Sequence, residues 1–263
     1  MIEIIITAIA IFAISLIFSM FGKGGGELYL PVMLTILNIA FYTAAGISLF
    51  LIFLQSISMI FVYSTKHKLI DWKLALILAF TVGFSSFLGG FVSAGISAVY
   101  LKLTFAVFLL VSAGLLFLNK NIKVKTGKFG TWHRKFSGGE YDINLLYVML
   151  PVSLAGFLAG MVGISGGGLI VPIAVLLGGM PIRIAMGTNT FLVLASSSMG
   201  FLGHVAGGRI EWNLCVVFGI SIIFGSQIGS HLHAKVNEKF LRIGLAFILV
   251  IAALWMILRI HMI

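Results

Sequence analysis

Charged residues are scarce in this chain: Asp, Glu, Lys and Arg make up 9% of its 263 residues, whereas 60% are hydrophobic. A soluble domain of this size cannot hide so much apolar surface, so the sequence excludes a soluble globular protein and indicates one that folds in lipid. The formal net charge of +10 would suggest a nucleic-acid partner for a soluble protein. In a membrane protein it indicates cytoplasmic loops beside anionic lipid, so we expect the lipid bilayer, and no nucleic acid, as a partner.

Cysteine, paired acids and phosphate-binding loops are missing as well. Cys215 is the single cysteine, so no internal disulfide and no thiolate metal cluster can form. The sequence contains no Gly-x-x-x-x-Gly-Lys-[Ser/Thr] run, which excludes the common ATP-binding loop. Apart from Glu27, the apolar segments offer no second buried carboxylate for acid–base chemistry. We therefore expect no enzyme, no catalytic residues, no metal site and no cofactor.

A stretch of 32 residues occurs twice, at an offset of 141. From Met20 to Leu51, ten positions are identical to those from Met161 to Leu192, where chance would supply roughly three in so apolar a chain. Both copies interrupt an apolar stretch with glycines and a proline at the same depth. A repeated, glycine-interrupted apolar segment is the pattern of a transporter binding site.

The whole chain divides into two copies of five apolar segments, joined by a polar linker. We expect an all-α multi-spanning membrane protein, multi-pass in the plasma membrane, because a run of about 20 apolar residues spans a bilayer as a helix. The second segment of each copy is short, which predicts a broken helix in each repeat. The predicted segments are Glu3–Phe21, Gly26–Leu37, Thr43–Tyr63, Trp72–Ala94 and Leu101–Leu118, then Ile143–Val162, Gly168–Gly178, Ile184–Val205, Trp212–Leu232 and Phe240–Leu258.

The loops of the two copies differ in charge in a way that predicts opposite orientations. The loop before Trp72 carries Lys66 and Lys68, whereas its counterpart carries only Arg209. Cytoplasmic loops concentrate Lys and Arg, so equivalent loops lie on opposite sides and the repeats have inverted topology. If all ten segments cross with both termini outside, 14 of the 17 basic residues lie inside, Lys23 among them. Residues 1–118 and 143–263 are then the two repeats, and 119–142 a basic cytoplasmic linker or a regulatory segment.

The glycine-rich breaks are the candidate binding site. A helix that begins at such a break presents free N–H groups and the positive end of its dipole, and glycine lets a ligand approach. We expect the two helix starts to face one another across one central anion site. Hydroxyl and amide groups at aligned positions would complete it, unless they only join helices by hydrogen bonds. The predicted substrate-binding residues are Gly24, Gly25, Gly26, Ser48, Ser165, Gly166, Gly167, Gly168, Thr188 and Asn189.

Five further polar residues are candidates for coupling or gating: Lys23, Glu27, Gln55, Gln227 and His204. Lys23 and Glu27 are four residues apart, so they can neutralise each other at a membrane boundary; alternatively, Lys23 attracts the anion or Glu27 carries a proton. His204 would be an interfacial polar tip or, alternatively, a proton relay. We expect His231 and His233 to be solvated near a polar loop.

The pattern Gly-x-[Gly/Ser]-Gly-Gly-x-apolar-x-x-Pro, present at 22–31 and 163–172, resembles the TauE/SafE family of sulfite and organosulfonate transporters. Each copy is followed by Ala-x-Gly-[Ile/Thr]-[Ser/Asn], and the likeness covers both halves. The resemblance implies a permease or exporter for sulfur oxyanions or other small organic anions. This sequence departs from the family pattern at Lys23 and Glu27, where small or apolar residues are more usual.

These observations predict a secondary transporter of small anions such as sulfite, organosulfonates or carboxylates, working by alternating access at a central Gly-rich site. An anion channel, or an accessory subunit of a larger membrane complex, is the alternative. A homo-oligomer is compatible with the sequence, which does not define the oligomeric state.

Overall fold

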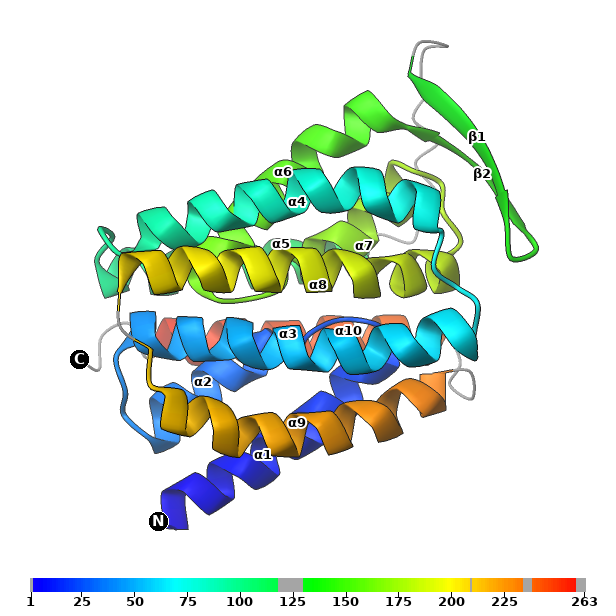
Figure 1. Ribbon diagram of the computed structural model, residues 1–263. Coiled ribbons are helices and arrows are strands. Elements are labelled where there is room, and N and C mark those ends of the chain that lie inside the picture. Colours follow the sequence, from blue (N-terminus) through cyan, green and yellow to red (C-terminus); the bar gives the residue numbers. More distant parts are fainter. Residues whose placement is uncertain (1, 118–129, 209, 234–237, 259–263) are drawn as a thin grey trace.

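The computed structural model describes residues 2–117, 130–208, 210–233 and 238–258 (Figure 1). Within these ranges the chain forms ten helices and one two-stranded hairpin. The first half contains α1 (Ile2–Met20), α2 (Gly26–Ile36), α3 (Phe41–Thr65), α4 (Trp72–Ser93) and α5 (Ala98–Phe117). The hairpin strands β1 (Thr131–Phe136) and β2 (Gly139–Asn144) follow, and then α6 (Leu145–Val162), α7 (Gly167–Leu176), α8 (Ile182–Gly207), α9 (Trp212–Leu232) and α10 (Glu238–Leu258).

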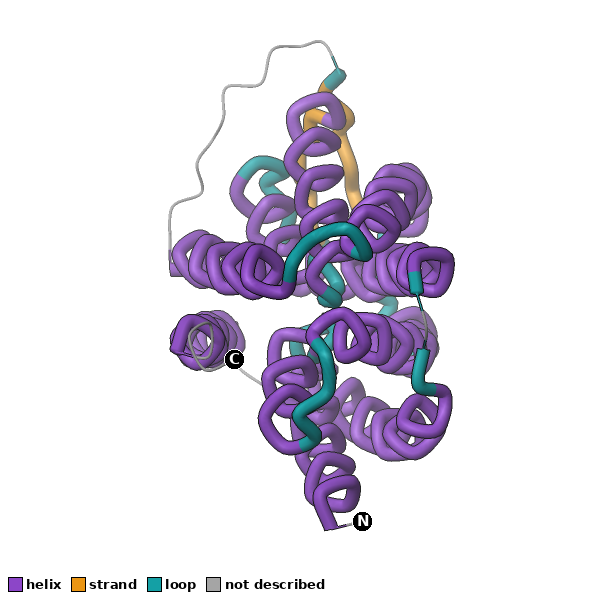
Figure 2. Tube along the Cα trace, turned by 90° about the vertical axis from the view of Figure 1, so that its left-hand side faces the viewer, coloured by secondary structure: helices purple, strands orange, loops and turns teal. Residues whose placement is uncertain are grey.

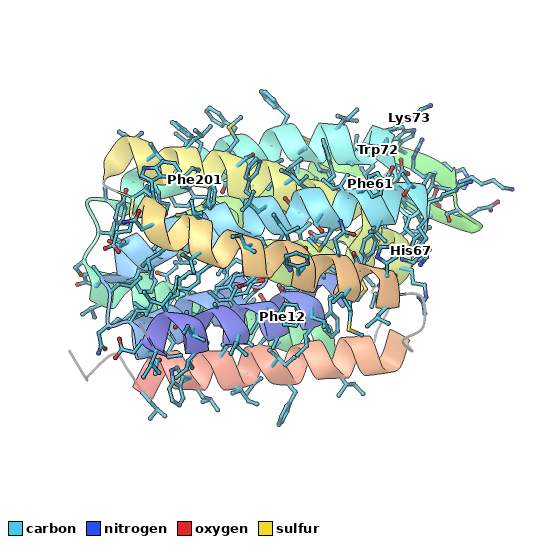
Figure 3. The ribbon with its side chains drawn as sticks, turned by 60° about the horizontal axis from the view of Figure 1, so that its bottom comes forward. Phe12, Phe61, His67, Trp72, Lys73 and Phe201 are labelled. Carbon is cyan, nitrogen blue, oxygen red and sulfur yellow. The ribbon has the colours of Figure 1, made fainter. Side chains whose placement is uncertain are left out.

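Each of the ten helices coincides with a predicted apolar segment, which confirms an all-α membrane protein. Among the described residues, seven helices are long and apolar enough to cross a membrane: α1, α3, α4, α5, α6, α8 and α9. Large apolar side chains such as Phe61, Phe80 and Leu150 are exposed, and Figure 3 labels Phe61 among them. Such a surface is unfavourable in water and is stable against lipid chains.

The two short helices begin inside the bundle. The α2 helix has 11 residues and the α7 helix has 10, so each is about 16 Å long, roughly half the thickness of the hydrocarbon core. The connections before them, 21–25 and 163–166, are buried throughout. The charge count predicts Lys23 on the cytoplasmic side, but the structure places it in the first break, with no solvent exposure.

The packing between the two halves is reciprocal: where a helix of one half packs on a helix of the other, the two counterparts also pack together. The α1 helix packs along α9, and its counterpart α6 packs along α4; α3 packs against α8, and α5 against α10. Figure 2 looks nearly along the helices and shows them packed side by side, with the hairpin at one edge. Because each half lies against the other over most of its helices, the core is shared and neither half encloses its own.

The ends of equivalent helices lie at opposite ends of the bundle. Figure 1 shows that α3 ends and α4 begins beside the hairpin, whereas α8 ends and α9 begins at the far end. Lys73 and His67 also lie at the hairpin end (Figure 3).

The linker contains structure that the sequence analysis did not predict. Thr131–Phe136 pairs antiparallel with Gly139–Asn144 around a two-residue turn, in which Ser137 and Gly138 both have positive φ angles. Residues 118–129, the rest of the linker, lie outside the described residues.

Three polar side chains attach this hairpin to the start of α4. The buried carboxylate of Asp71, the residue before α4, accepts hydrogen bonds from Arg134 Nε at 2.9 Å and from the Tyr141 hydroxyl at 2.7 Å. The other carboxylate oxygen accepts a second Arg134 hydrogen bond and caps α4 through the Leu74 amide. Burial alone would raise the pKa of Asp71, but these hydrogen bonds outweigh it and hold the pKa below its ordinary value.

Candidate anion site at the two helix breaks

Two glycines allow the breaks to pass close to the opposite half. Gly22 has a φ of +64°, and a Cβ atom on it would lie 2.4 Å from the carbonyl oxygen of Met186. Its counterpart Gly163 has a φ of +84°, and its Cβ would lie 2.5 Å from the Cα of Ala45. Met186 and Ala45 are themselves equivalent at the offset of 141. Glycine is therefore required at both positions by backbone conformation and by space.

A reciprocal pair of hydrogen bonds joins each break to the opposite half. The Ser48 hydroxyl, on α3, donates to the carbonyl oxygen of Gly163 at 2.7 Å. The Asn189 amide, at the equivalent position on α8, donates to the carbonyl oxygen of Gly22 at 2.9 Å. Both predicted residues thus reach the breaks, and both act there as hydrogen-bond donors between helices.

The side chain of Gln55, a residue of α3, forms hydrogen bonds at the start of α2. Its side-chain oxygen accepts hydrogen bonds from the Gly25 amide at 3.2 Å and from the Tyr29 hydroxyl at 2.9 Å, and its nitrogen donates to Ser19 Oγ at 2.9 Å. An N–H group at this helix start is therefore already satisfied by a neutral amide. The aligned Ser196 plays a corresponding part in the second break, where it donates to the carbonyl oxygen of Ser165 at 2.8 Å.

The start of α7 instead faces the charged pair of the first break. Lys23 Nζ and Glu27 Oε1 are 2.6 Å apart, and both side chains are fully buried. A Cβ atom on Gly168 would lie 3.2 Å from Glu27 Oε1 and 3.4 Å from Lys23 Nζ. The predicted pair exists, but it lies in the protein interior and not at a membrane boundary. Because α7 begins here, the positive end of its dipole acts on the Glu27 carboxylate.

Several buried polar atoms at this point lack a hydrogen-bond partner among the described residues. If the contact between Lys23 and Glu27 is set aside, the atoms without a partner are Lys23 Nζ, both carboxylate oxygens of Glu27, Ser165 Oγ and Asn189 Oδ1. A Cβ atom on Gly167 would lie 2.8 Å from Asn189 Nδ2, and a Cβ atom on Gly24 would lie 3.2 Å from Ser165 Oγ. These polar groups therefore converge on one region. Unsatisfied polar groups in a dry interior are costly unless a ligand pairs with them.

This arrangement suits a small anion. Lys23 supplies a cation, Ser165 a hydroxyl donor, and the first turn of α7 its free N–H groups and dipole. Gly166, with a φ of +69°, is the N-cap of α7, so the helix begins without a side-chain cap of its own. The two Gly-rich breaks lie close together; that their helix starts face one another across one central anion site stays a prediction.

Sequence analysis missed Ser112 of α5. A Cβ atom on Gly168 would lie 3.2 Å from its hydroxyl, which donates to the Phe108 carbonyl at 2.7 Å. An isolated hydroxyl within an apolar helix was the signal that could have identified it.

Two predicted residues make different contacts. Thr188 Oγ1 accepts a hydrogen bond from the Asp71 amide at 3.1 Å and so links α8 to the start of α4. Gln227 is half-buried on α9, and its side chain has no hydrogen bond to the described residues. Among the described residues, neither side chain forms a hydrogen bond to the breaks.

The histidines are more buried than the sequence indicated. His204, expected as an interfacial tip, is fully buried; its Nε2 donates to the Gly160 carbonyl at 3.0 Å, and its ring packs on Tyr42. His233, expected to be solvated, is buried against Tyr63, and its Nδ1 donates to the Met20 carbonyl at 2.6 Å. Burial lowers the pKa of His233 to about 4. His231, by contrast, is exposed.

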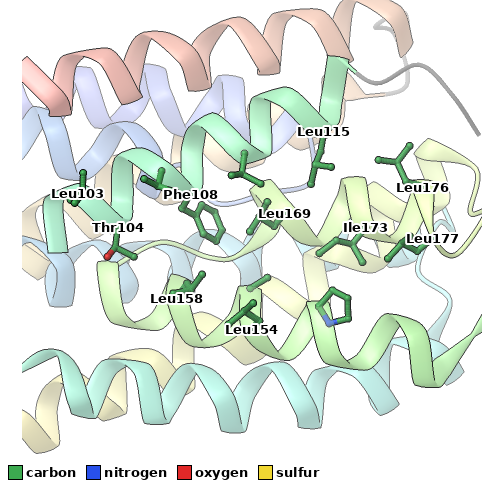
Figure 4. A pocket seen from close by; sticks show the side chains of 14 residues that line it. Leu103, Thr104, Phe108, Leu115, Leu154, Leu158, Leu169, Ile173, Leu176 and Leu177 are labelled. Atoms are coloured by element: carbon green, nitrogen blue, oxygen red, sulfur yellow. The ribbon is translucent and has the colours of Figure 1, made fainter. Parts of the chain in front are cut away.

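A large apolar groove lies elsewhere, between α5, α6 and α7 (Figure 4). Its volume is about 610 Å³, and its lining is almost entirely apolar, with Leu103, Phe108, Leu158 and Ile173 among the residues in view. A smaller groove of about 210 Å³ lies at the equivalent place between α2 and α10. The residues that line these two grooves include no charged donor for an anion, and both grooves suit hydrocarbon chains of lipid, so the candidate site remains at the breaks.

Comparison with known proteins points to one family of membrane transporters. The family model described as "Sulfite exporter TauE/SafE" matches residues 7–256. The probable membrane transporter protein YunE of Bacillus subtilis is 27% identical over 84% of this chain and 84% of its own length. A probable membrane transporter protein of Methanocaldococcus jannaschii is 28% identical over 94% of this chain and 92% of its own length.

A more distant relative, sulfite exporter TauE/SafE family protein 6 of Arabidopsis thaliana, is 31% identical over 43% of this chain and 27% of its own length. No solved structure matches the chain significantly.

Proposed function

Because the chain belongs to the sulfite exporter TauE/SafE family, whose matched relatives are named as membrane transporters and not as enzymes, we propose that it is a secondary transporter of small anions in the plasma membrane. The substrates would be sulfite, organosulfonates or small carboxylates. The observation that carries this proposal is the buried Lys23 beside the start of α7, a helix without a side-chain cap, with Ser165 and Asn189 unsatisfied at the same point.

The binding mode follows from the donors available. The anion would take the Lys23 ammonium, the Ser165 hydroxyl and the free N–H groups of Gly167 and Gly168, and Asn189 would orient one further polar atom. Oxygen atoms of a sulfonate or carboxylate accept such hydrogen bonds, and charge-assisted ones are the strongest. A larger anion would meet the packed glycines, so the site favours small ones.

Transport would follow from movement of the two repeats around this site. The repeats would have inverted topology, which the opposite placement of the α3–α4 and α8–α9 ends supports (Figure 1). A hydrogen bond from Ser48 or Asn189 joins each break to the opposite half. Exchanging such reciprocal contacts is a means by which inverted repeats open a fixed central site first to one side and then to the other.

The direct test is flux in proteoliposomes with sulfite, methanesulfonate, 4-toluenesulfonate and acetate. We expect saturable uptake of at least one anion and counterflow, in which unlabelled anion inside drives entry of labelled anion. Lys23→Met should abolish uptake while the protein still inserts. Flux without saturation or counterflow would indicate a channel, and folded protein without flux of any anion would refute the proposal.

A further inference from the structure

The carboxylate of Glu27 occupies the position that an anion would take at the start of α7. It is paired with Lys23 at 2.6 Å, and the glycine whose missing side chain leaves room for it is Gly168. A bound anion therefore has to compete with Glu27 for the same ammonium and the same helix start. Without a bound anion, the Glu27 carboxylate is therefore the negative group that pairs with Lys23.

The interior cannot hold both negative charges. A bound monovalent anion and an ionised Glu27 would share one lysine in a fully buried region, where water screens neither charge. The ionisable groups that act electrostatically with Glu27 are Lys23 and Tyr29. The polar side chains nearby on α3, α5 and α8 are Gln55, Ser112 and Asn189, which carry no charge. Among the described residues, Lys23 alone can compensate a negative charge here.

A proton resolves the conflict. When the anion takes Lys23, a proton from the aqueous side that is open at that moment binds a Glu27 carboxylate oxygen, and the neutral acid withdraws from the ammonium. Before binding, the charges are one positive and one negative; afterwards they are one positive lysine, one negative substrate and a neutral Glu27. The net charge of the site is unchanged, so it can move between the two sides without carrying charge across the bilayer.

We propose that Glu27 is the binding site for a co-transported proton, one for each monovalent anion, with Lys23 exchanged between Glu27 and the substrate. The inference rests on the proposed anion transport. It predicts electroneutral movement of proton and anion in the same direction, and binding that weakens as pH rises because binding takes up a proton.

The experiment uses methanesulfonate, which stays ionised across the accessible pH range, so that any pH dependence comes from the protein. Purified full-length protein in lipid nanodiscs is titrated by thermal shift from about pH 5.5 to 8. We expect the Kd of the wild type to rise by up to about tenfold per pH unit at the alkaline end. In proteoliposomes with an internal pH dye, we expect one proton to enter with each anion.

Glu27→Gln keeps the shape of the side chain and removes its charge. It should bind methanesulfonate with a Kd independent of pH, and its uptake should become electrogenic and lose the proton flux. Glu211→Gln, the same substitution at an exposed residue before α9, should behave like the wild type.

Retained proton flux in a folded Glu27→Gln protein, or wild-type anion uptake with no proton entering, would overturn the assignment of Glu27 and leave anion transport intact. If Glu27→Gln does not fold, the wild type still tests the proposal, because anion uptake without a proton would overturn it. Failure of the wild type to bind or move any anion would instead refute the proposed function itself.

Discussion

Removal of single groups from the Asp71 cluster should release the hairpin from the bundle in graded steps. Tyr141→Phe deletes one hydrogen bond to a charged acceptor, which contributes about 1.5 kcal/mol. Arg134→Ala leaves the Asp71 carboxylate buried without its cation, which costs about 3 kcal/mol. The Asp71 carboxylate is almost fully buried, and the Arg134 side chain is 14% exposed, so solvent screens this pair little.

Hydrogen exchange of the hairpin amides measures this opening directly. At about 1.4 kcal/mol per tenfold, Tyr141→Phe should speed exchange in 131–144 roughly tenfold, and Arg134→Ala more than a hundredfold, with the core of α8 unchanged. The control is Lys135→Ala, which removes the ion pair between Lys135 and Glu140 in the same hairpin. The Lys135 side chain is 77% exposed and the Glu140 side chain 55%. Such a pair contributes under about 0.5 kcal/mol, so exchange should change about twofold or less.

The pH dependence of the same protection has a defined sign. The pKa of Asp71 is lowered in the folded protein, so its contribution is complete above its unfolded value of about 4 and is lost as the pH falls through the lowered pKa. Equal exchange in Arg134→Ala and Lys135→Ala, or protection that persists in acid, would refute the view that Asp71 holds the hairpin in place.

Two further predictions concern the interior. Gly163→Ala should destabilise the protein by about 3 kcal/mol in thermal unfolding, because its φ is +84° and the new Cβ meets Ala45; Gly114→Ala, which meets nothing within 4 Å, is the control, and equal melting of both variants would contradict the argument. His204→Gln should retain transport and its pH profile, because the amide can still donate to Gly160; a lost pH dependence would show that His204 relays protons.

The helices were predictable because length and apolarity alone define them in lipid. The breaks were also predictable, since glycines and a proline that recur at equal spacing in two apolar segments are typical of interrupted membrane helices. The equivalence of Ser48 and Asn189 followed from the offset of 141, and their hydrogen bonds to Gly163 and Gly22 agree with it.

The contacts that depend on distant parts of the chain could not be predicted. Asp71 lies 63 residues from Arg134, and nothing local indicates that they meet. Ser112 of α5 and Glu27 of α2 both lie against Gly168 of α7, so this contact joins three separate helices. The hairpin did have a local signal, two strand-like runs around Ser137-Gly138, a pair that suits a turn with two positive φ angles. The basic charge of the linker obscured it.

The geometry of the breaks also explains why a duplicated chain carries an unduplicated ion pair. At the offset of 141, Lys23 corresponds to Ile164 and Glu27 to Gly168. Glu27 lies against Gly168, with its carboxylate oxygen 3.2 Å from the place of a Cβ atom there. A glutamate at 168 would have to occupy the room that Glu27 fills, and its charge would oppose that of Glu27 in a dry interior. Where the starts of α2 and α7 lie this close together, only one of the two helices can supply the charged side chains. The other has to supply the space and the helix dipole, so the ion pair occurs once although the surrounding sequence occurs twice.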